Sequence, residues 1–165
     1  MASKKGIVVT IAVLVGVVAA SFMVYLIPED TTMKIVVSDF KKHLDITNEK
    51  ASMEVTSIDE SFEKLMEEKM SPNEYIKIAE VSSSQINSLI IELTNSGATQ
   101  EWSESYVNYI GALKKLNEKI TETIVVANLM SSDNNSNSIN KIIAKIHQLE
   151  TESQDLIKKS DNTRP

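Results

Sequence analysis

The sequence lacks cysteine, and this absence excludes disulfide bonds, catalytic thiols and thiolate metal ligands. Helix packing alone must therefore stabilise the folded part of the chain. The four glycines form no phosphate-binding loop, and the sequence has neither a Walker-type lysine nor a GxSxG motif. The only histidines, His43 and His147, belong to no HExxH or Glu-x-x-His pair. We expect no enzyme, no metal site and no cofactor, and we interpret both histidines as surface residues.

Positive charge is also scarce, since 17 Lys and Arg stand against 23 Asp and Glu. Lys4 and Lys5 precede a long apolar run, whereas every acidic residue follows it. Beyond the run, 15 basic residues remain against 23 acidic ones, so this part carries a net charge of about −8. Such a surface repels nucleic acid, whose phosphates require basic patches, and nucleic-acid binding is excluded.

The apolar run covers residues 6–27 and contains no charged side chain. At 1.5 Å per residue it would reach roughly 33 Å, enough for a hydrocarbon core about 30 Å thick. The flanking lysines predict that residues 1–5 stay in the cytoplasm and that the chain after the run lies outside it. The alternative is a cleaved secretory signal with small residues at 19–21. A signal h-region is typically shorter, about 7–15 residues, which favours an uncleaved anchor in membrane lipid.

The chain after a polar linker at residues 28–37 shows apolar residues at alternating spacings of three and four, the pattern of amphipathic helices with coiled-coil-like contacts. Ser38 is a candidate N-cap for the first helix. Ser71 and Glu74 form a capping-box sequence, and Gly97 suits the left-handed position after a helix. Helices are predicted at residues 38–70, 72–96, 100–130 and 138–159, and no strand is predicted.

Four such helices joined by short loops bury their apolar stripes most simply in an antiparallel up-down bundle. The predicted fold is therefore all-α, with a transmembrane helix followed by a four-helix bundle over residues 38–159. A three-helix bundle with a protruding first helix is the alternative, because that helix is predicted to be longer than the second and fourth. Residues 160–165 have no apolar side chain to bury and are predicted to form a flexible tail.

Aromatic and polar side chains on the second and third predicted helices are candidates for binding. Aromatic residues at helical spacing more often belong to a core, and a ligand or partner patch is the alternative. Polar residues on the stripes, including Asn48 and Ser153, could set the helix register, hold buried water or line a cavity. The candidate patch consists of Tyr75, Ser82, Gln85, Trp102, Tyr106 and Tyr109.

Two further candidates lie outside these helices. Asn134 begins an Asn-x-Ser sequon in a polar stretch and is a candidate glycosylation acceptor. Gly16 and Ala20 form a small-xxx-small pair within the apolar run, which could bring two membrane helices close enough to make a homodimer.

Short stretches spread over nearly the whole chain carry a resemblance to known proteins. They are Lys5-Gly6-Ile7, residues 22–28, Val37-Ser38-Asp39-Phe40, Ser71-Pro72-Asn73-Glu74-Tyr75, Ser82-Ser83-Ser84-Gln85-Ile86-Asn87, Glu101-Trp102-Ser103-Glu104-Ser105-Tyr106 and residues 159–165. Together they are similar to small, single-pass, membrane-anchored helical proteins of ammonia-oxidising archaea, a family without an assigned activity. The resemblance implies location and helical shape.

The sequence thus favours a non-enzymatic, membrane-anchored module outside the cytoplasm that binds a partner protein or supports the cell envelope. The alternative, by fold-level analogy with chemoreceptor domains, is a sensor-like or solute-binding bundle that passes a signal to another membrane protein. A cavity lined by Ser82, Gln85 or Tyr109 would favour solute binding, whereas a tight core with an exposed apolar patch would favour a protein partner.

Overall fold

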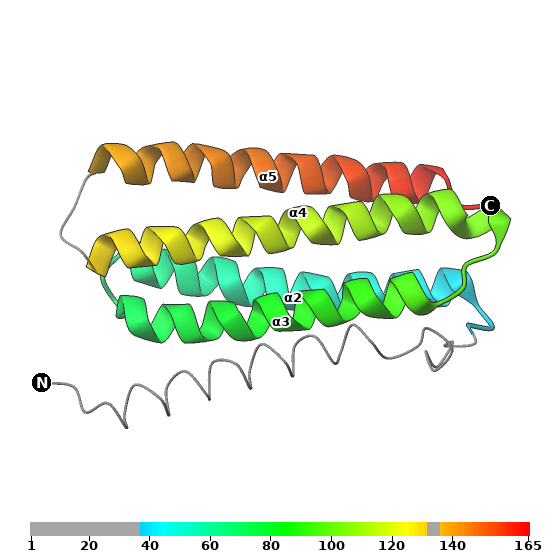
Figure 1. Cartoon of the computed structure of the whole chain (residues 1–165), viewed down its shortest axis with the longest axis horizontal. Helices are drawn as coiled ribbons and strands as arrows, with labels where there is room; N and C mark the ends of the chain where they lie inside the picture. Colours follow the sequence, from blue (N-terminus) through cyan, green and yellow to red (C-terminus); the bar gives the residue numbers. More distant parts are fainter. Residues whose placement is uncertain (1–36, 132–135) are drawn as a thin grey trace, which may run out of the picture. The chain divides into compact units, whose positions relative to one another are not determined.

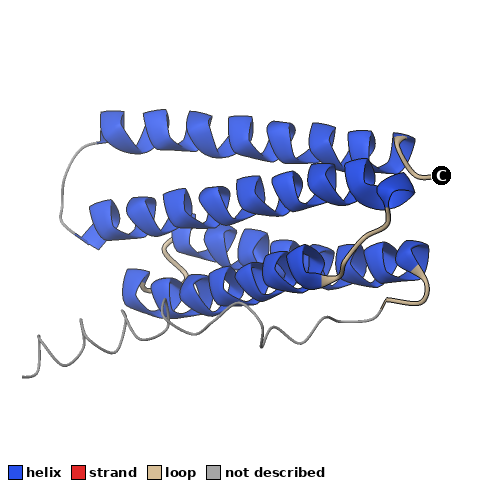
Figure 2. Ribbon diagram, turned by 45° about the vertical axis from the view of Figure 1, so that its right-hand side comes forward, coloured by secondary structure: helices blue, strands red, loops and turns tan. Residues whose placement is uncertain are grey.

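The computed structural model describes residues 37–131 and 136–165, which form four α-helices and no strand. The helices are α2 (Phe40–Met66), α3 (Pro72–Asn95), α4 (Gln100–Ser131) and α5 (Ser136–Asn162). Successive helices run in opposite directions and form a bundle (Figures 1 and 2). The predicted all-α four-helix bundle is confirmed. The predicted anchor at residues 6–27 lies outside the described residues, and none of the described helices is long and apolar enough to span a bilayer.

A seven-residue repeat of buried side chains holds the helices together. In α2 the side chains of Leu44, Ala51, Ile58 and Leu65 follow one another at this spacing, and each is at most 2 % exposed. Burial of a leucine or isoleucine contributes about 1.5–3 kcal/mol, so each such row stabilises the bundle strongly. α4 has buried side chains on more than one face, because it contacts the three other helices.

Helix ends follow local signals, with two differences from prediction. The N-cap of α2 is Asp39 instead of Ser38, since the Asp39 side chain accepts a hydrogen bond from the Lys42 amide at 2.9 Å. α2 also ends at Met66 and not near residue 70, and Glu68 has a left-handed φ of 58°. At 27 residues, α2 is therefore no longer than α5. The Ser71 cap of α3 is confirmed by its bond from the Glu74 amide.

The predicted flexible tail at residues 160–165 is wrong. α5 continues to Asn162, and Ser160 is fully buried. The Ser105 hydroxyl of α4 donates to the Ser160 carbonyl at 2.9 Å, and Arg164 forms an ion pair with Asp45 of α2. Polar partners on other helices thus fix this segment in place of apolar burial.

The two described glycines are expected to respond oppositely to alanine. Gly111 lies inside α4, where an added Cβ would meet Leu156 Cδ1 at 3.4 Å, so Gly111→Ala should stabilise the bundle by about 0.5–1 kcal/mol. Gly97 has a φ of +64°, so Gly97→Ala should cost about 1 kcal/mol. Urea unfolding of the detergent-solubilised full chain measures both. Earlier unfolding of Gly111→Ala would mean that α4 and α5 cannot accept the methyl group.

Candidate binding cleft between α2 and α5

The bundle is open on one side. α4 lies beside α2, α3 and α5, but no Cα atom of α2 comes within 8 Å of one in α5 (Figure 1). A cleft with a volume of about 220 Å³ lies between these two helices, with α4 as its floor. It is lined by Asn48, Ala51, Ser52, Val55 and Thr56 of α2, by Tyr109 and Leu116 of α4, and by Glu150, Ser153, Gln154 and Ile157 of α5. We call this the cleft.

The polar groups at the bottom of the cleft already have hydrogen-bond partners. The Tyr109 hydroxyl donates to Asn48 Oδ1 at 3.0 Å, and the Ser153 hydroxyl donates to the Ala112 carbonyl at 3.0 Å. Burial raises the pKa of Tyr109 well above its usual range, with a further contribution from Asp161, so the phenol is neutral at physiological pH. The bottom of the cleft is therefore a fixed, uncharged polar centre.

A buried cation lies beside the cleft. Lys119 of α4 is only 4 % exposed, although lysine is seldom buried unless paired. Its Nζ lies 2.7 Å from Asp59 Oδ1 of α2 and 3.7 Å from Glu150 Oε2 of α5. This side chain thus connects two helices whose backbones do not meet. Sequence reasoning missed Lys119, yet Ala112 and Val126, seven residues to either side, are both fully buried and could have marked its position.

A second cation lies at the end of the bundle where α5 ends. Arg164 Nη1 is 2.5 Å from Asp45 Oδ1 of α2, and Arg164 Nη2 is 2.7 Å from Asp161 Oδ1. Hydrogen bonds from Lys41 and from Arg164 lower the pKa of Asp45 below its usual value. The stabilising contribution of the Asp45 carboxylate is therefore complete above the usual aspartate pKa. It is lost as the pH falls through the lowered pKa of Asp45. Both cations near the cleft already interact with carboxylates.

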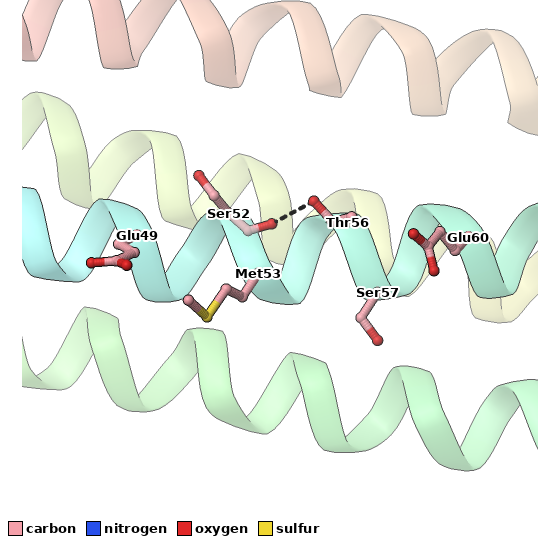
Figure 3. Close-up of a pocket in the computed structure, with 6 residues that line it drawn as sticks. All are labelled: Glu49, Ser52, Met53, Thr56, Ser57 and Glu60. Atoms are coloured by element: carbon pink, nitrogen blue, oxygen red, sulfur yellow. Dashed lines mark hydrogen bonds between the residues drawn. The ribbon is translucent and has the colours of Figure 1, made fainter.

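A shallow hollow continues the cleft across the outer face of α2. It has a volume of about 640 Å³ and is lined by Glu49, Ser52, Met53, Thr56, Ser57 and Glu60, all from α2. Ser52 and Thr56 line both the hollow and the cleft. In Figure 3 these two residues lie on the side of α2 that faces α5, while Met53 and Ser57 point toward α3. We call this surface the α2 hollow.

His43 forms a polar cluster that sequence reasoning missed. Its Nδ1 lies 2.9 Å from the Tyr106 hydroxyl of α4, and its Nε2 lies 2.9 Å from Glu92 Oε1 of α3. The His43 side chain is only 12 % exposed, so the prediction of a surface histidine was wrong. The Tyr106 hydroxyl also contacts the Phe40 carbonyl at 3.2 Å. The cluster connects three helices at one end of the bundle and is a structural contact.

The residues predicted to form one ligand or partner patch do not come together. Tyr75 is fully buried where α3 begins, and its ring centroid lies 5.7 Å from that of Phe62. Trp102 lies where α4 begins, at the opposite end of the bundle, with its ring centroid 6.2 Å from that of Phe40. A single patch is therefore not formed, because these aromatic rings fill the core at separate ends.

The other predicted residues occupy different places. Ser82 is 3 % exposed, Gln85 is an exposed residue of α3 whose amide faces the Glu54 carboxylate, and both line a shallow hollow of about 460 Å³ between α2 and α3. Of the predicted patch only Tyr109 lines the cleft. Asn48 and Ser153 also line the cleft, which agrees with the interpretation that these polar stripe residues line a cavity. The candidate glycosylation site Asn134 and the anchor pair of Gly16 and Ala20 lie outside the described residues.

Across residues 37–131 and 136–165, no three His, Asp or Glu side chains converge as a metal site would require. No protein-family model, curated protein or solved structure matches the chain.

Proposed function

We propose that the chain is a non-enzymatic helical module, anchored in a membrane through residues 6–27, whose bundle lies outside the cytoplasm and binds a partner protein in the cleft. The uncharged run and the two lysines that precede it support the anchor and its orientation. The resemblance to membrane-anchored helical proteins of ammonia-oxidising archaea supports the same location.

The observation that carries the binding proposal is the open side of the bundle. Pockets for whole organic ligands typically measure about 300–1,000 Å³, and the cleft is smaller at about 220 Å³. The hydroxyls of Tyr109 and Ser153 already donate to Asn48 and to the Ala112 carbonyl, so neither proton is free for a solute. A cleft of this size fits a few side chains that project from a larger partner.

Photocrosslinking tests the partner proposal. A benzoylphenylalanine at Ser52 or Gln154, on the two walls of the cleft, is expected to give a discrete crosslinked product in membranes of cells that produce the chain. The same probe at Ser84, an exposed residue of α3, is the matched control and should give no such product. Equal crosslinking from all three positions would argue against a partner in the cleft.

Membrane orientation is tested with introduced cysteines, because the chain has none of its own. A membrane-impermeant maleimide is expected to label an Asp155→Cys variant on intact cells and to leave a Ser3→Cys variant unlabelled until the membrane is opened. Asp155 is exposed on α5, so access to the bundle is not limiting. The reverse labelling pattern would place the bundle in the cytoplasm.

Binding of a small solute is the second candidate function, and it is favoured by the Tyr109 hydroxyl, which lines the cleft and whose oxygen can still accept a hydrogen bond while it donates to Asn48. A bundle of this kind would pass a signal to another membrane protein. Tyr109→Phe separates the two functions, since it removes the hydroxyl that a solute would contact and keeps the aromatic wall. Loss of the Gln154 crosslink in this variant would favour a solute-dependent function, whereas an unchanged crosslink favours the direct partner.

A further inference from the structure

The open side of the bundle offers a continuous surface along two helices. The cleft and the α2 hollow share Ser52 and Thr56, which are labelled in Figure 3. Together the cleft and the α2 hollow extend from the floor on α4 across the outer face of α2. Small side chains at these two positions let the backbone of an occupant approach closely. A helix laid between α2 and α5 would have walls on both sides and α4 beneath it.

Apolar side chains are available along this surface. Met53 in the α2 hollow is 62 % exposed, and Val55 and Ile157 are half-buried on the two walls of the cleft. The cleft can take only a few side chains at once, which suits the side chains that one face of an amphipathic helix presents every three or four residues.

The rim of this surface is negatively charged. Lys119 is shared by Asp59 and Glu150, so one negative charge is left in excess beside the cleft. Glu49 and Glu60 of the α2 hollow form no ion pair with any other described residue. These two glutamates are eleven positions apart, so they lie roughly 16 Å apart along α2. Two cations three turns apart on a neighbouring helix would match them.

We infer that the occupant of the cleft and the α2 hollow is a basic amphipathic helix of the partner protein, an inference that rests on the proposed function. A second copy of this chain is disfavoured because its open side carries the same negative rim and would repel the first. Opposite charge steers association and sets orientation, while the apolar side chains in the cleft supply the affinity.

A pair of peptides tests this inference on the full chain in zwitterionic nanodiscs at about 0.15 M salt. Both peptides are amphipathic helices with the same leucine face, and their polar face carries lysine in one and glutamate in the other. Fluorescence anisotropy, corrected for binding to empty nanodiscs, measures affinity. The lysine peptide is expected to bind at least about tenfold more tightly than the glutamate peptide.

Two pairs of variants locate the binding. The double variant Glu49→Lys with Glu60→Lys should weaken binding of the lysine peptide by about tenfold or more. The control, Glu80→Lys with Glu104→Lys, makes the same charge change at exposed positions elsewhere and should weaken binding by less than about threefold. Ser52→Trp should fill the shared wall and block binding, whereas Ser84→Trp on α3 should leave it unchanged.

The outcomes separate the inference from the proposed function. If both double variants weaken binding of the lysine peptide equally, net charge alone explains the attraction, and the inference is overturned. A partner that crosslinks at Gln154 while the lysine peptide fails to bind would overturn the basic helix and leave partner binding in place. Failure of the crosslink and of the peptide together would overturn both.

Discussion

The Lys119→Glu variant is expected to lose roughly 3–5 kcal/mol of unfolding free energy. The Lys119 side chain is buried, and its ammonium lies between Asp59 of α2 and Glu150 of α5. A glutamate there would bury a third carboxylate beside Asp59 and Glu150, and it would remove the cation that links the two helices. Chemical denaturation of the solubilised full chain, followed by circular dichroism, measures the loss.

Two further variants show whether burial is the cause. Lys115→Glu makes the same charge change four residues earlier, where the side chain pairs with Glu118 and Glu152 at the surface, and its loss should be clearly smaller. Lys119→Met keeps the aliphatic part of the side chain and lets the partly exposed carboxylates hydrate, so about 1 kcal/mol or less should be lost. Equal losses for Lys119→Glu and Lys115→Glu would contradict a desolvated ammonium.

Alkaline pH is expected to produce the second large effect, because tyrosines are buried in the core. Burial raises the pKa of Tyr75 to about 12, against the opposing effect of its hydrogen bond to Thr123, and burial likewise raises the pKa of Tyr106 to about 12. The unfolded chain loses these protons near pH 10, so their contribution is complete below pH 10 and is lost as the pH rises to about 12. Tyr75 alone accounts for roughly 3 kcal/mol, and denaturation at a series of pH values measures it.

Tyr75→Phe is the matched variant for this effect. At neutral pH it should be less stable than the natural chain by about 1 kcal/mol, because Thr123 loses the hydroxyl that donates to it at 2.6 Å. Above pH 11 the order should reverse, since phenylalanine has no proton to lose. Parallel stability curves for the two chains would refute the assignment to Tyr75.

Local sequence signals predicted those features whose partners lie within one turn of the helix. Ser71 caps α3 through an amide three residues away, and Gly97 needs only its own positive φ. The seven-residue repeat predicted which face of each helix is buried. It also predicted the four-helix bundle, because few other arrangements bury the apolar faces of four such helices.

Features that depend on distant residues were not predictable in this way. The stripes do not say which helices meet, so the opening between α2 and α5 could not be derived from them. The order of residues 160–165 depends on Asp45 and Ser105, far away in the chain. Asp39 and Ser38 are both good N-caps, and a choice between neighbours requires the three-dimensional path of the chain.

The last helix of the bundle rests on a single neighbour, since α5 has no Cα atom within 8 Å of α2 or α3. Opening of this one interface would separate α5 from the other three helices, so we expect the amide protons of α5 to exchange with deuterium together in a single step. A molecule gripped by α2 and α5 together would suppress that partial opening. Slower deuterium uptake confined to α5 would then report occupancy without any label on the occupant.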